Sequence, residues 1–352
     1  MTTDPDVKRG SATDHLVASL PKMAETSRSH EVSARLRPNL LRELSEQAIL
    51  ETIFREGPIT RPEIAERTRI SKPTVSAVVE RLVQAGLVQP AGERPGRRGR
   101  TPIAYVVDSA AGFVVGVDLG STRLRIAATN IYGELLREDE LETATGAKAV
   151  GDQISAAVED IARELRPKHG PLLAMGVSTP GVVDPATRRV TSLAYHVSNS
   201  GTLDSLSKLE ARFRVPVLVD NDVNVAAIGE KWRGLAASVP TFVFVTIGAG
   251  VGMGIVIDNE LYRGFHGAAG EIGYLPLAAD PFDEQHRRLG GRIGSAPELL
   301  PPIRGTVSRL LPLPTRIEIS ALAERAALEG ALAMGLREAR DRLFSRERRS
   351  AT

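Results

Sequence analysis

The sequence predicts an α/β protein, with a winged helix-turn-helix at its start and a two-lobed domain after it. Two short helical patterns separated by a three-residue turn predict the first part. The second part is predicted by a pattern that occurs at Phe113–Leu136 and again at Thr241–Leu261: an apolar run, a turn of small residues and a returning apolar run. The two copies start about 128 residues apart, which indicates an internal duplication. Ala and Leu at helical spacing through Phe344 predict a closing, packed helix.

The composition excludes several classes of protein. A chain of 352 residues is long enough for two or three domains with cores of their own. No apolar run approaches the roughly 20 residues that cross a bilayer, and no apolar signal core precedes the first predicted helix, so we expect a cytoplasmic protein without membrane contact. The chain has no cysteine, which excludes disulfides, thiol catalysis and thiolate metal sites, and its six scattered histidines predict no metal site.

The predicted domains follow from where periodicity begins and changes. Residues 1–36 show none and are predicted to form a disordered arm. Residues 37–110 form the predicted winged helix-turn-helix, and residues 111–352 form the two-lobed domain. Its lobes are predicted at about 111–235 and 236–345.

Three helices are predicted in the first domain. Apolar residues recur at helical spacing from Leu40 up to a stop at Gly57. A capping box made by Thr60 and Glu63 opens a second, short helix. Ser71 caps the third. This pair of short helices is the helix-turn-helix arrangement.

The third helix carries the predicted base-reading residues. It starts with small polar side chains and is predicted to end at Gly86, a left-handed C-cap. Lys72, Thr74 and Ser76 are expected to face outward near its start, where short side chains let the helix enter a major groove. Lys72 is expected to meet a phosphate.

A basic cluster follows in the position of a wing. The apolar strand patterns at Val88 and at residues 103–107 predict a hairpin, and its tip holds four arginines within seven residues: Arg94, Arg97, Arg98 and Arg100. These side chains are predicted to contact the DNA backbone or a narrow minor groove. The alternative is a helical protein-interaction module with a basic loop.

Two glycine-containing turns of the second part are predicted to bind phosphate. A Rossmann site requires a helix directly after its glycines, whereas Ile255–Ile257 reads as a strand. The two hairpins are instead predicted to hold phosphates between the lobes through backbone N–H groups. The residues concerned are Gly120, Ser121, Thr122, Gly248 and Gly250.

Acidic and amide side chains mark a predicted ligand cleft. Asn221 and Asp222 stand at the C-terminal end of a buried strand, the sheet edge that faces ligand in α/β proteins. Asp222 is able to act there as a general base toward a hydroxyl or to hydrogen-bond it; alternatively it is the N-cap of a helix over 223–232. Glu271 lies within a glycine-rich turn, which favours a ligand contact over a solvated side chain.

Five stretches together resemble the ROK family of repressors, open reading frames and sugar kinases: DLGST, STPGVVD, VPVLVDNDVNVAAIGE, GAGVGMGIV and GAAGEIGYLP. The winged helix places the resemblance on the regulator branch. It implies an actin/hexokinase-like fold with a sugar in the interlobe cleft. By position it implies sugar contacts at Asn199, Asn221, Asp222 and Glu271, with Asp222 in the place of the kinase general base. His266 is a further candidate.

Three departures from the family pattern limit what the resemblance implies. Tyr274 stands where a zinc-binding histidine is common, and the family's zinc motif is absent, so no zinc is expected. Leu289–Leu300 follows Tyr274 too soon, which predicts an abbreviated C-terminal lobe with an exposed apolar surface that is covered by a partner or left unstable. The first phosphate turn reads Ser121-Thr122-Arg123, and not the Gly-Thr-Lys of active kinases.

These patterns predict a sugar-responsive transcriptional regulator, a repressor that binds a double-stranded DNA operator as a homodimer or higher homo-oligomer. A sugar or sugar phosphate in the cleft would change the operator affinity. The alternative is an ATP-dependent sugar kinase with a DNA-binding module; only then would ATP and magnesium be cofactors, and otherwise none is expected. A regulator that answers a protein partner instead of a sugar is a third possibility.

Overall fold

The computed structural model describes residues 28–93, 102–188, 190–191, 202–247, 251–274, 297–311 and 313–344. The chain divides into two compact units, residues 1–45 and 46–352. Helix α1 (Arg28–Glu56) begins before the predicted Leu40. Residues 28–36, which the sequence assigned to a disordered arm, are therefore helical, and the rest of that arm lies outside the described residues.

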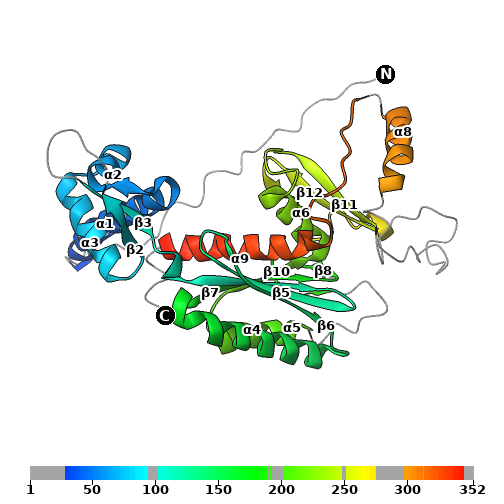
Figure 1. Ribbon diagram of the computed structural model, residues 1–352, viewed down its shortest axis with the longest axis horizontal. Helices are drawn as coiled ribbons and strands as arrows, with labels where there is room; N and C mark the ends of the chain where they lie inside the picture. Colours follow the sequence, from blue (N-terminus) through cyan, green and yellow to red (C-terminus); the bar gives the residue numbers. More distant parts are fainter. Residues whose placement is uncertain are drawn as a thin grey trace, which may run out of the picture. The chain divides into compact units, whose positions relative to one another are not determined.

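The predicted winged helix is confirmed in the part of the chain that the structure describes. Its three short strands form one sheet in the order β1-β3-β2, which packs beside three helices (Figure 1). After α1 the elements are β1 (Ile59–Thr60), α2 (Arg61–Thr68), α3 (Lys72–Gln84), β2 (Val88–Glu93) and β3 (Ile103–Val107).

The predicted helix ends also form. Glu63 accepts hydrogen bonds from the backbone N–H of Thr60 (2.8 Å) and from its hydroxyl (2.7 Å). Ser71 Oγ accepts from the Thr74 backbone N–H at 3.3 Å and so caps α3. Gly86 has φ +69°, and its neighbour Leu87 donates its N–H back into the last turn of α3. Only glycine adopts this backbone without strain.

The first lobe is built on a five-stranded mixed sheet in the order β10-β7-β4-β5-β6, in which β4, β7 and β10 run parallel. Alternate residues of β4 point to opposite faces. One face packs against α4 and α5, and the other packs against α9 (Figure 1). The elements are β4 (Phe113–Leu119), β5 (Arg123–Asn130), β6 (Leu135–Glu142), α4 (Ala147–His169), β7 (Leu172–Thr179), α5 (Thr202–Phe213) and β10 (Val217–Asn221), with a small sheet of β8 (Val182–Val183) and β9 (Val190–Thr191).

The second lobe repeats the hairpin of the first, as the duplication predicted, in a sheet of order β11-β12-β13. Helix α6 packs on one face of this sheet. The predicted exposed apolar surface is present, because Val243 and Val245 of β11 are about half exposed (50% and 49%). The elements are α6 (Asp222–Arg233), β11 (Phe242–Ile247), β12 (Val251–Ile257), β13 (Glu260–Leu261), α8 (Leu300–Leu310) and α9 (Ala326–Phe344).

Helix α9 is the closing packed helix that the sequence predicted, and it packs on the sheet of the first lobe as well as on α6. Leu328, Leu332 and Leu336 are buried against Val114 of β4 and Ala174 of β7. The predicted lobe of residues 236–345 is therefore divided, since its last helix contributes to the core of the other lobe.

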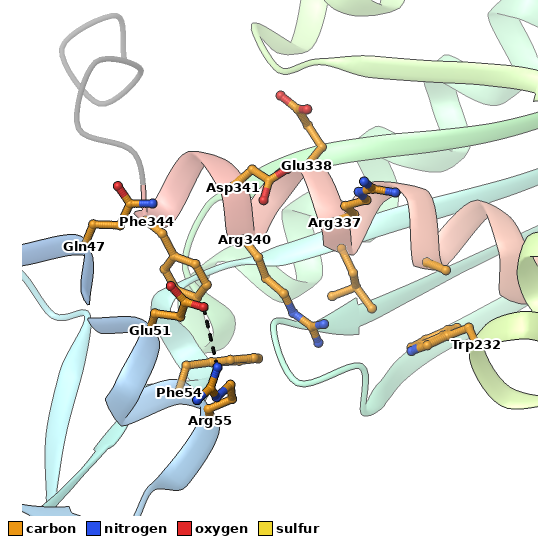
Figure 2. A pocket seen from close by; sticks show the side chains of 12 residues that line it. Gln47, Glu51, Phe54, Arg55, Trp232, Arg337, Glu338, Arg340, Asp341 and Phe344 are labelled. Atoms are coloured by element: carbon orange, nitrogen blue, oxygen red, sulfur yellow. Dashed lines mark ion pairs between the residues drawn. The ribbon is translucent and has the colours of Figure 1, made fainter. Parts of the chain in front are cut away.

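The winged helix and the first lobe share one apolar core at the predicted boundary near residue 110. Phe54 of α1 stacks on Tyr132 at a centroid distance of 5.1 Å and contacts Phe344 at 5.6 Å. The Tyr132 hydroxyl donates to the carbonyl of Val107 in β3 (2.8 Å). The guanidinium of Arg340 lies over the Phe54 ring at 4.8 Å. Figure 2 shows Phe54, Arg340 and Phe344 along a groove of about 810 Å³ between α1 and α9.

Candidate functional site

The predicted base-reading residues lie on the open side of α3. Val75, Val79 and Leu82 are buried on its inner side, whereas Lys72 and Thr74 are exposed and Ser76 is half-buried. The four wing arginines, Arg94, Arg97, Arg98 and Arg100, lie outside the described residues.

One of these side chains already has a partner. The Thr74 hydroxyl shares a 2.8 Å hydrogen bond with the Ser71 hydroxyl at the start of the helix. This hydrogen bond at the helix cap restricts the rotamer in which the Thr74 hydroxyl would face a base. Lys72 has no such restriction within the described contacts.

The predicted ligand residues meet at the N-terminus of α6. Asn221, the last residue of β10, is the N-cap: its side-chain oxygen accepts from the backbone N–H of Val223 (2.9 Å) and Asn224 (3.3 Å). Asp222 is thus the first residue of α6 and not its cap, which corrects the alternative reading. The Asn221 amide also donates to the carbonyl of Gly181 (3.1 Å), and so holds the turn after β7 against this helix end.

Asp222 stands among other carboxylates. Its pKa is raised to about 6, chiefly by burial and in smaller part by the negative charges of Asp118 and Glu271, against the lowering effect of the hydrogen bond from the Val223 N–H. Burial likewise raises the pKa of Glu271. These interactions bring together residues from the ends of β4 and β10 and from the glycine-rich loop, as expected for one cleft. A carboxyl with a pKa near neutrality is suited to exchange or share a proton with a hydroxyl group.

Asp118 is a further candidate site residue, which was not selected from the sequence although it stands in the quoted DLGST motif. It is buried at the end of β4 and accepts a 3.0 Å hydrogen bond from the hydroxyl of Ser178 at the end of β7. Burial raises the pKa of Asp118, while Ser178 and the Arg125 guanidinium lower it. Its position at a strand end could have identified it, because β4 and β7 run parallel and their carboxyl ends lie at the same edge of the sheet.

The loop from Arg263 to Glu271 is fixed on both sides. Met253 of β12 donates its N–H to the carbonyl of Gly270 (2.9 Å). Gly270 has φ +91°, and a Cβ there would lie 1.7 Å from the Met253 carbonyl oxygen, so the turn that presents Glu271 requires glycine. At its start, Arg263 Nε donates to Oδ2 of the buried Asp220 at 2.7 Å. The sequence analysis missed this pair, since no local spacing links the two residues.

Several predicted site residues are not brought into this cluster. Asn199, Gly248 and Gly250 lie outside the described residues. His266 is exposed, with its ring against the edge of Phe265 at 4.8 Å, and makes no described contact with Asp222.

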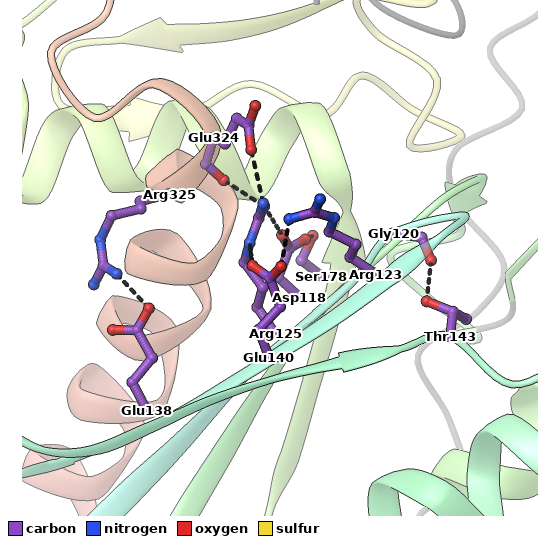
Figure 3. A network of polar contacts seen from close by, with 10 residues as sticks. All are labelled: Asp118, Gly120, Arg123, Arg125, Glu138, Glu140, Thr143, Ser178, Glu324 and Arg325. Carbon is purple, nitrogen blue, oxygen red and sulfur yellow. Dashed lines mark hydrogen bonds and ion pairs between the residues drawn. The ribbon is translucent and has the colours of Figure 1, made fainter. Parts of the chain in front are cut away.

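The first phosphate turn is held closed by hydrogen bonds (Figure 3). The Gly120 N–H donates to the Arg123 carbonyl (2.9 Å), and the Thr143 hydroxyl donates to the Gly120 carbonyl (2.9 Å). Ser121 and Thr122 are exposed at its tip.

Arg125 places a positive charge beside the first phosphate turn. Its guanidinium pairs with Glu140 (2.9 Å) and Glu324 (2.8 Å) and lies 3.8 Å from Oδ2 of Asp118. Figure 3 shows it between these carboxylates. A fixed cation beside Asp118 neutralises the carboxylate that a nucleotide-bound magnesium ion would need.

Two searches over the described residues gave negative results. No group of three or more His, Cys, Asp or Glu side chains among them is arranged to hold a metal ion. Within the same residues, no helix is long and apolar enough to cross a membrane.

Comparison with known families gives two matches. Residues 114–292 match the ROK family, and residues 45–99 match the MarR family. The first range contains the cluster around Asp222, and the second contains α3 and the start of the wing.

Individual relatives are similar over most of this chain. A xylose repressor of Caldicellulosiruptor bescii is 30% identical over 244 residues, which are 68% of this chain and 60% of the repressor. The DNA-binding transcriptional dual regulator NagC of Escherichia coli is 26% identical over 253 residues, 70% of this chain and 60% of NagC. The chain thus matches about 60% of the length of these curated relatives.

A solved structure has the same fold. It is a ROK family transcriptional regulator, a homologue of the Escherichia coli MLC protein, and superposes with a TM-score of 0.53 over 80% of this chain and 70% of that one. At 20% identity this likeness shows the fold alone.

Proposed function

The chain belongs to the ROK family, and we propose that it is a DNA-binding repressor whose operator affinity changes when a sugar or sugar phosphate binds beside Asp222. The observation that carries the proposal is a single compact unit in which a winged helix and a cluster of interacting carboxylates belong to domains joined by a shared apolar core. One relative named as a xylose repressor and another named as a DNA-binding transcriptional dual regulator support it.

The DNA-binding half is supported by the exposed start of α3. Its apolar side is buried against the module, so the side with Lys72 and Thr74 is free to enter a major groove. The wing hairpin then follows at the position where basic side chains reach the backbone.

The ligand-binding half is supported by the chemistry of the cleft. Sugar hydroxyls both donate and accept hydrogen bonds, and the Asp222 and Glu271 carboxyls are able to offer both kinds of partner at the N-terminus of α6. A neutral polyol suits this site, because a strongly anionic group beside three carboxyls would be repelled.

The same helix that begins at the site reaches the element that contacts the winged helix. Helices α6 and α9 approach so closely that a Cβ on Gly330 would lie 1.8 Å from the Val225 carbonyl oxygen, and one on Gly229 would lie 2.0 Å from the Ala326 carbonyl oxygen. The far end of α9 carries Phe344, which packs on Phe54 of the winged-helix module. A ligand that shifts the start of α6 would therefore move α9 as well, because close-packed helices move together.

A sugar kinase is the second candidate, and one observation favours it: a carboxyl at the position of Asp222 with a pKa of about 6 suits a general base. The guanidinium of Arg125 beside Asp118 argues against magnesium-dependent phosphoryl transfer. We therefore infer ligand binding without turnover, and no requirement for zinc or nucleotide.

Titration calorimetry on the full chain tests the ligand site. A panel of pentoses, hexoses, N-acetylhexosamines and their phosphates is titrated into the wild type, Asp222→Asn and Glu271→Ala, with Asp152→Asn on the exposed side of α4 as the control. We expect one sugar class to bind the wild type and the control, and to bind both cleft variants at least tenfold more weakly. Binding that is equal in all four proteins would refute the site. Sugar-dependent ADP release from ATP, abolished by Asp222→Asn, would establish the kinase instead.

A further inference from the structure

The sheet of the second lobe has one covered face and one open face. On the covered side, Gly254 lies against Ala227 of α6, and Val256 is 2% exposed. On the opposite side, Val243, Val245 and Ile257 are 50%, 49% and 44% exposed. Val245 pairs with Met253 in register, so these side chains form one apolar surface.

In the first lobe, the strand that corresponds to β11 is covered by other elements of the chain. Every residue of β4 is buried. Strands β5 and β7 pair with its two edges, and α4 covers the face turned away from α9. Its counterpart β11 pairs, within the described residues, with β12 alone. The duplicated hairpin therefore lacks a described equivalent of both the neighbouring strand and the covering helix.

Helix α8 carries an apolar stripe that is not buried against any other element that the structure describes. Leu300, Ile303, Val307 and Leu310 recur at intervals of three and four residues and so form one apolar stripe. No residue of α8 is buried, and Leu310 is 74% exposed. An apolar stripe of this kind forms a stable helix only when it packs on another surface.

Helix α8 is held to its own chain by a polar side chain beside the apolar stripe, and not by the stripe residues. Arg304 donates from Nε to the Ile317 carbonyl (3.0 Å) and pairs with Glu318 at 3.3 Å. This tether holds α8 against the segment that precedes α9 and leaves the apolar stripe facing outward.

Charge at the rim of both surfaces is complementary. The charged side chains of α8 are all basic, Arg304 and Arg309. The turn that closes the open face between β12 and β13 carries Asp258 and Glu260, both exposed, and Glu260 already pairs with Arg337 at 3.5 Å. A helix laid on this face would bring opposite charges together at its edge.

We propose that α8 of one copy packs its Leu300–Leu310 stripe on the Val243–Val245 face of a second copy, and that the second copy returns the same contact. Each chain carries both halves of the interface, so two copies satisfy both in one closed two-fold arrangement. The interface also brings two winged helices into one particle, as a palindromic operator requires.

Engineered cysteines test the contact directly, because the natural chain has none. Val245→Cys and Leu310→Cys are combined in the full chain, which is then oxidised with copper-phenanthroline and analysed on a non-reducing gel. We expect a covalent dimer from the double variant and from a mixture of the two single variants, and little from either single variant alone. A monomer that carries an internal disulfide would show that α8 docks in its own chain and would overturn the proposal. A dimer from Val245→Cys alone would show pairing of two sheets and would overturn it equally.

Sedimentation equilibrium provides a second measurement that needs no cross-link. The wild type is expected to be a dimer at micromolar concentration, whereas Val245→Lys and Leu310→Lys are each expected to weaken dimerisation at least tenfold. Leu135→Lys is the control, since Leu135 on β6 is also about half exposed (51%) and lies outside both surfaces. A monomeric wild type, or dimerisation that the two variants leave unchanged, would refute the interface and leave the proposed ligand site untouched.

Discussion

Substitution of Gly330 by alanine tests whether α6 and α9 move as one body. The added Cβ would lie 1.8 Å from the Val225 carbonyl oxygen, whereas ordinary contact begins near 3.4 Å, so the helices must separate by about 1.5 Å. Overpacking of this kind destabilises a fold by about 1–3 kcal/mol. Gly335→Ala is the matched control on the same helix, because its Cβ would meet its nearest atoms at 3.4 Å and 3.5 Å.

The assay compares stability with ligand response. Urea denaturation is expected to show a loss of about 2 kcal/mol for Gly330→Ala and no loss for Gly335→Ala, in which alanine also favours the helix. Operator binding is then measured with and without the sugar. Couplings between sites are typically 1–3 kcal/mol, or about 5–150-fold in affinity. We expect Gly335→Ala to keep the wild-type ratio and Gly330→Ala to lose most of it. Equal ratios in the two variants would show that the signal does not pass through this contact.

Three further predictions address other contacts. The pKa of Asp222 is raised to about 6 from 3.8, chiefly by burial, so its ionisation destabilises the folded state as the pH rises through this range. At pH 7.5, Asp222→Asn should therefore be more stable than wild type by roughly 3 kcal/mol. Urea denaturation should show that this difference disappears below about pH 4. Phe54→Ala removes the ring between Tyr132 and Phe344 and should cost about 2 kcal/mol and reduce the sugar effect on DNA without changing sugar affinity by calorimetry. Lys72→Ala should weaken binding to all DNA sequences and lower the slope of log K against log salt by about one, and an unchanged slope would exclude a phosphate contact.

Local patterns were sufficient to predict most of the fold. The Thr60–Glu63 capping box, the Ser71 cap and the positive φ of Gly86 each depend on a few neighbouring residues, and all three are found in the structure. The repeated hairpin was visible because turn residues and apolar runs recur at both places in the chain.

Long-range contacts could not be predicted in this way. Packing of α9 on β4 and β7 could not be predicted, because its Leu and Ala stripe fits either lobe. The pair of Arg263 and Asp220 and the approach of Arg125 to Asp118 join residues from different elements. The start of α1 at Arg28 was missed because charged and polar residues there hide the apolar period.

The candidate site was predicted in its centre and incompletely at its edges. Asp222 and Glu271 interact as expected, since each stands at a strand end or in a constrained turn. Asn221 has a different role from the one predicted, because its side chain caps α6. Asp222 is the first residue of that helix and not its cap. Asp118 was overlooked because its motif was read for its backbone turn and not for its carboxylate.

Fluorescence anisotropy on labelled DNA from upstream of the gene tests the central claim most directly. The full chain is titrated with and without the sugar that calorimetry identifies, as wild type, Glu271→Ala and the control Asp152→Asn. We predict that the sugar changes the DNA affinity of wild type and control at least fivefold and leaves Glu271→Ala unchanged, although that variant still binds the DNA. Sequence-specific binding that no sugar alters in the wild type, or a sugar effect that persists in Glu271→Ala, would contradict the account.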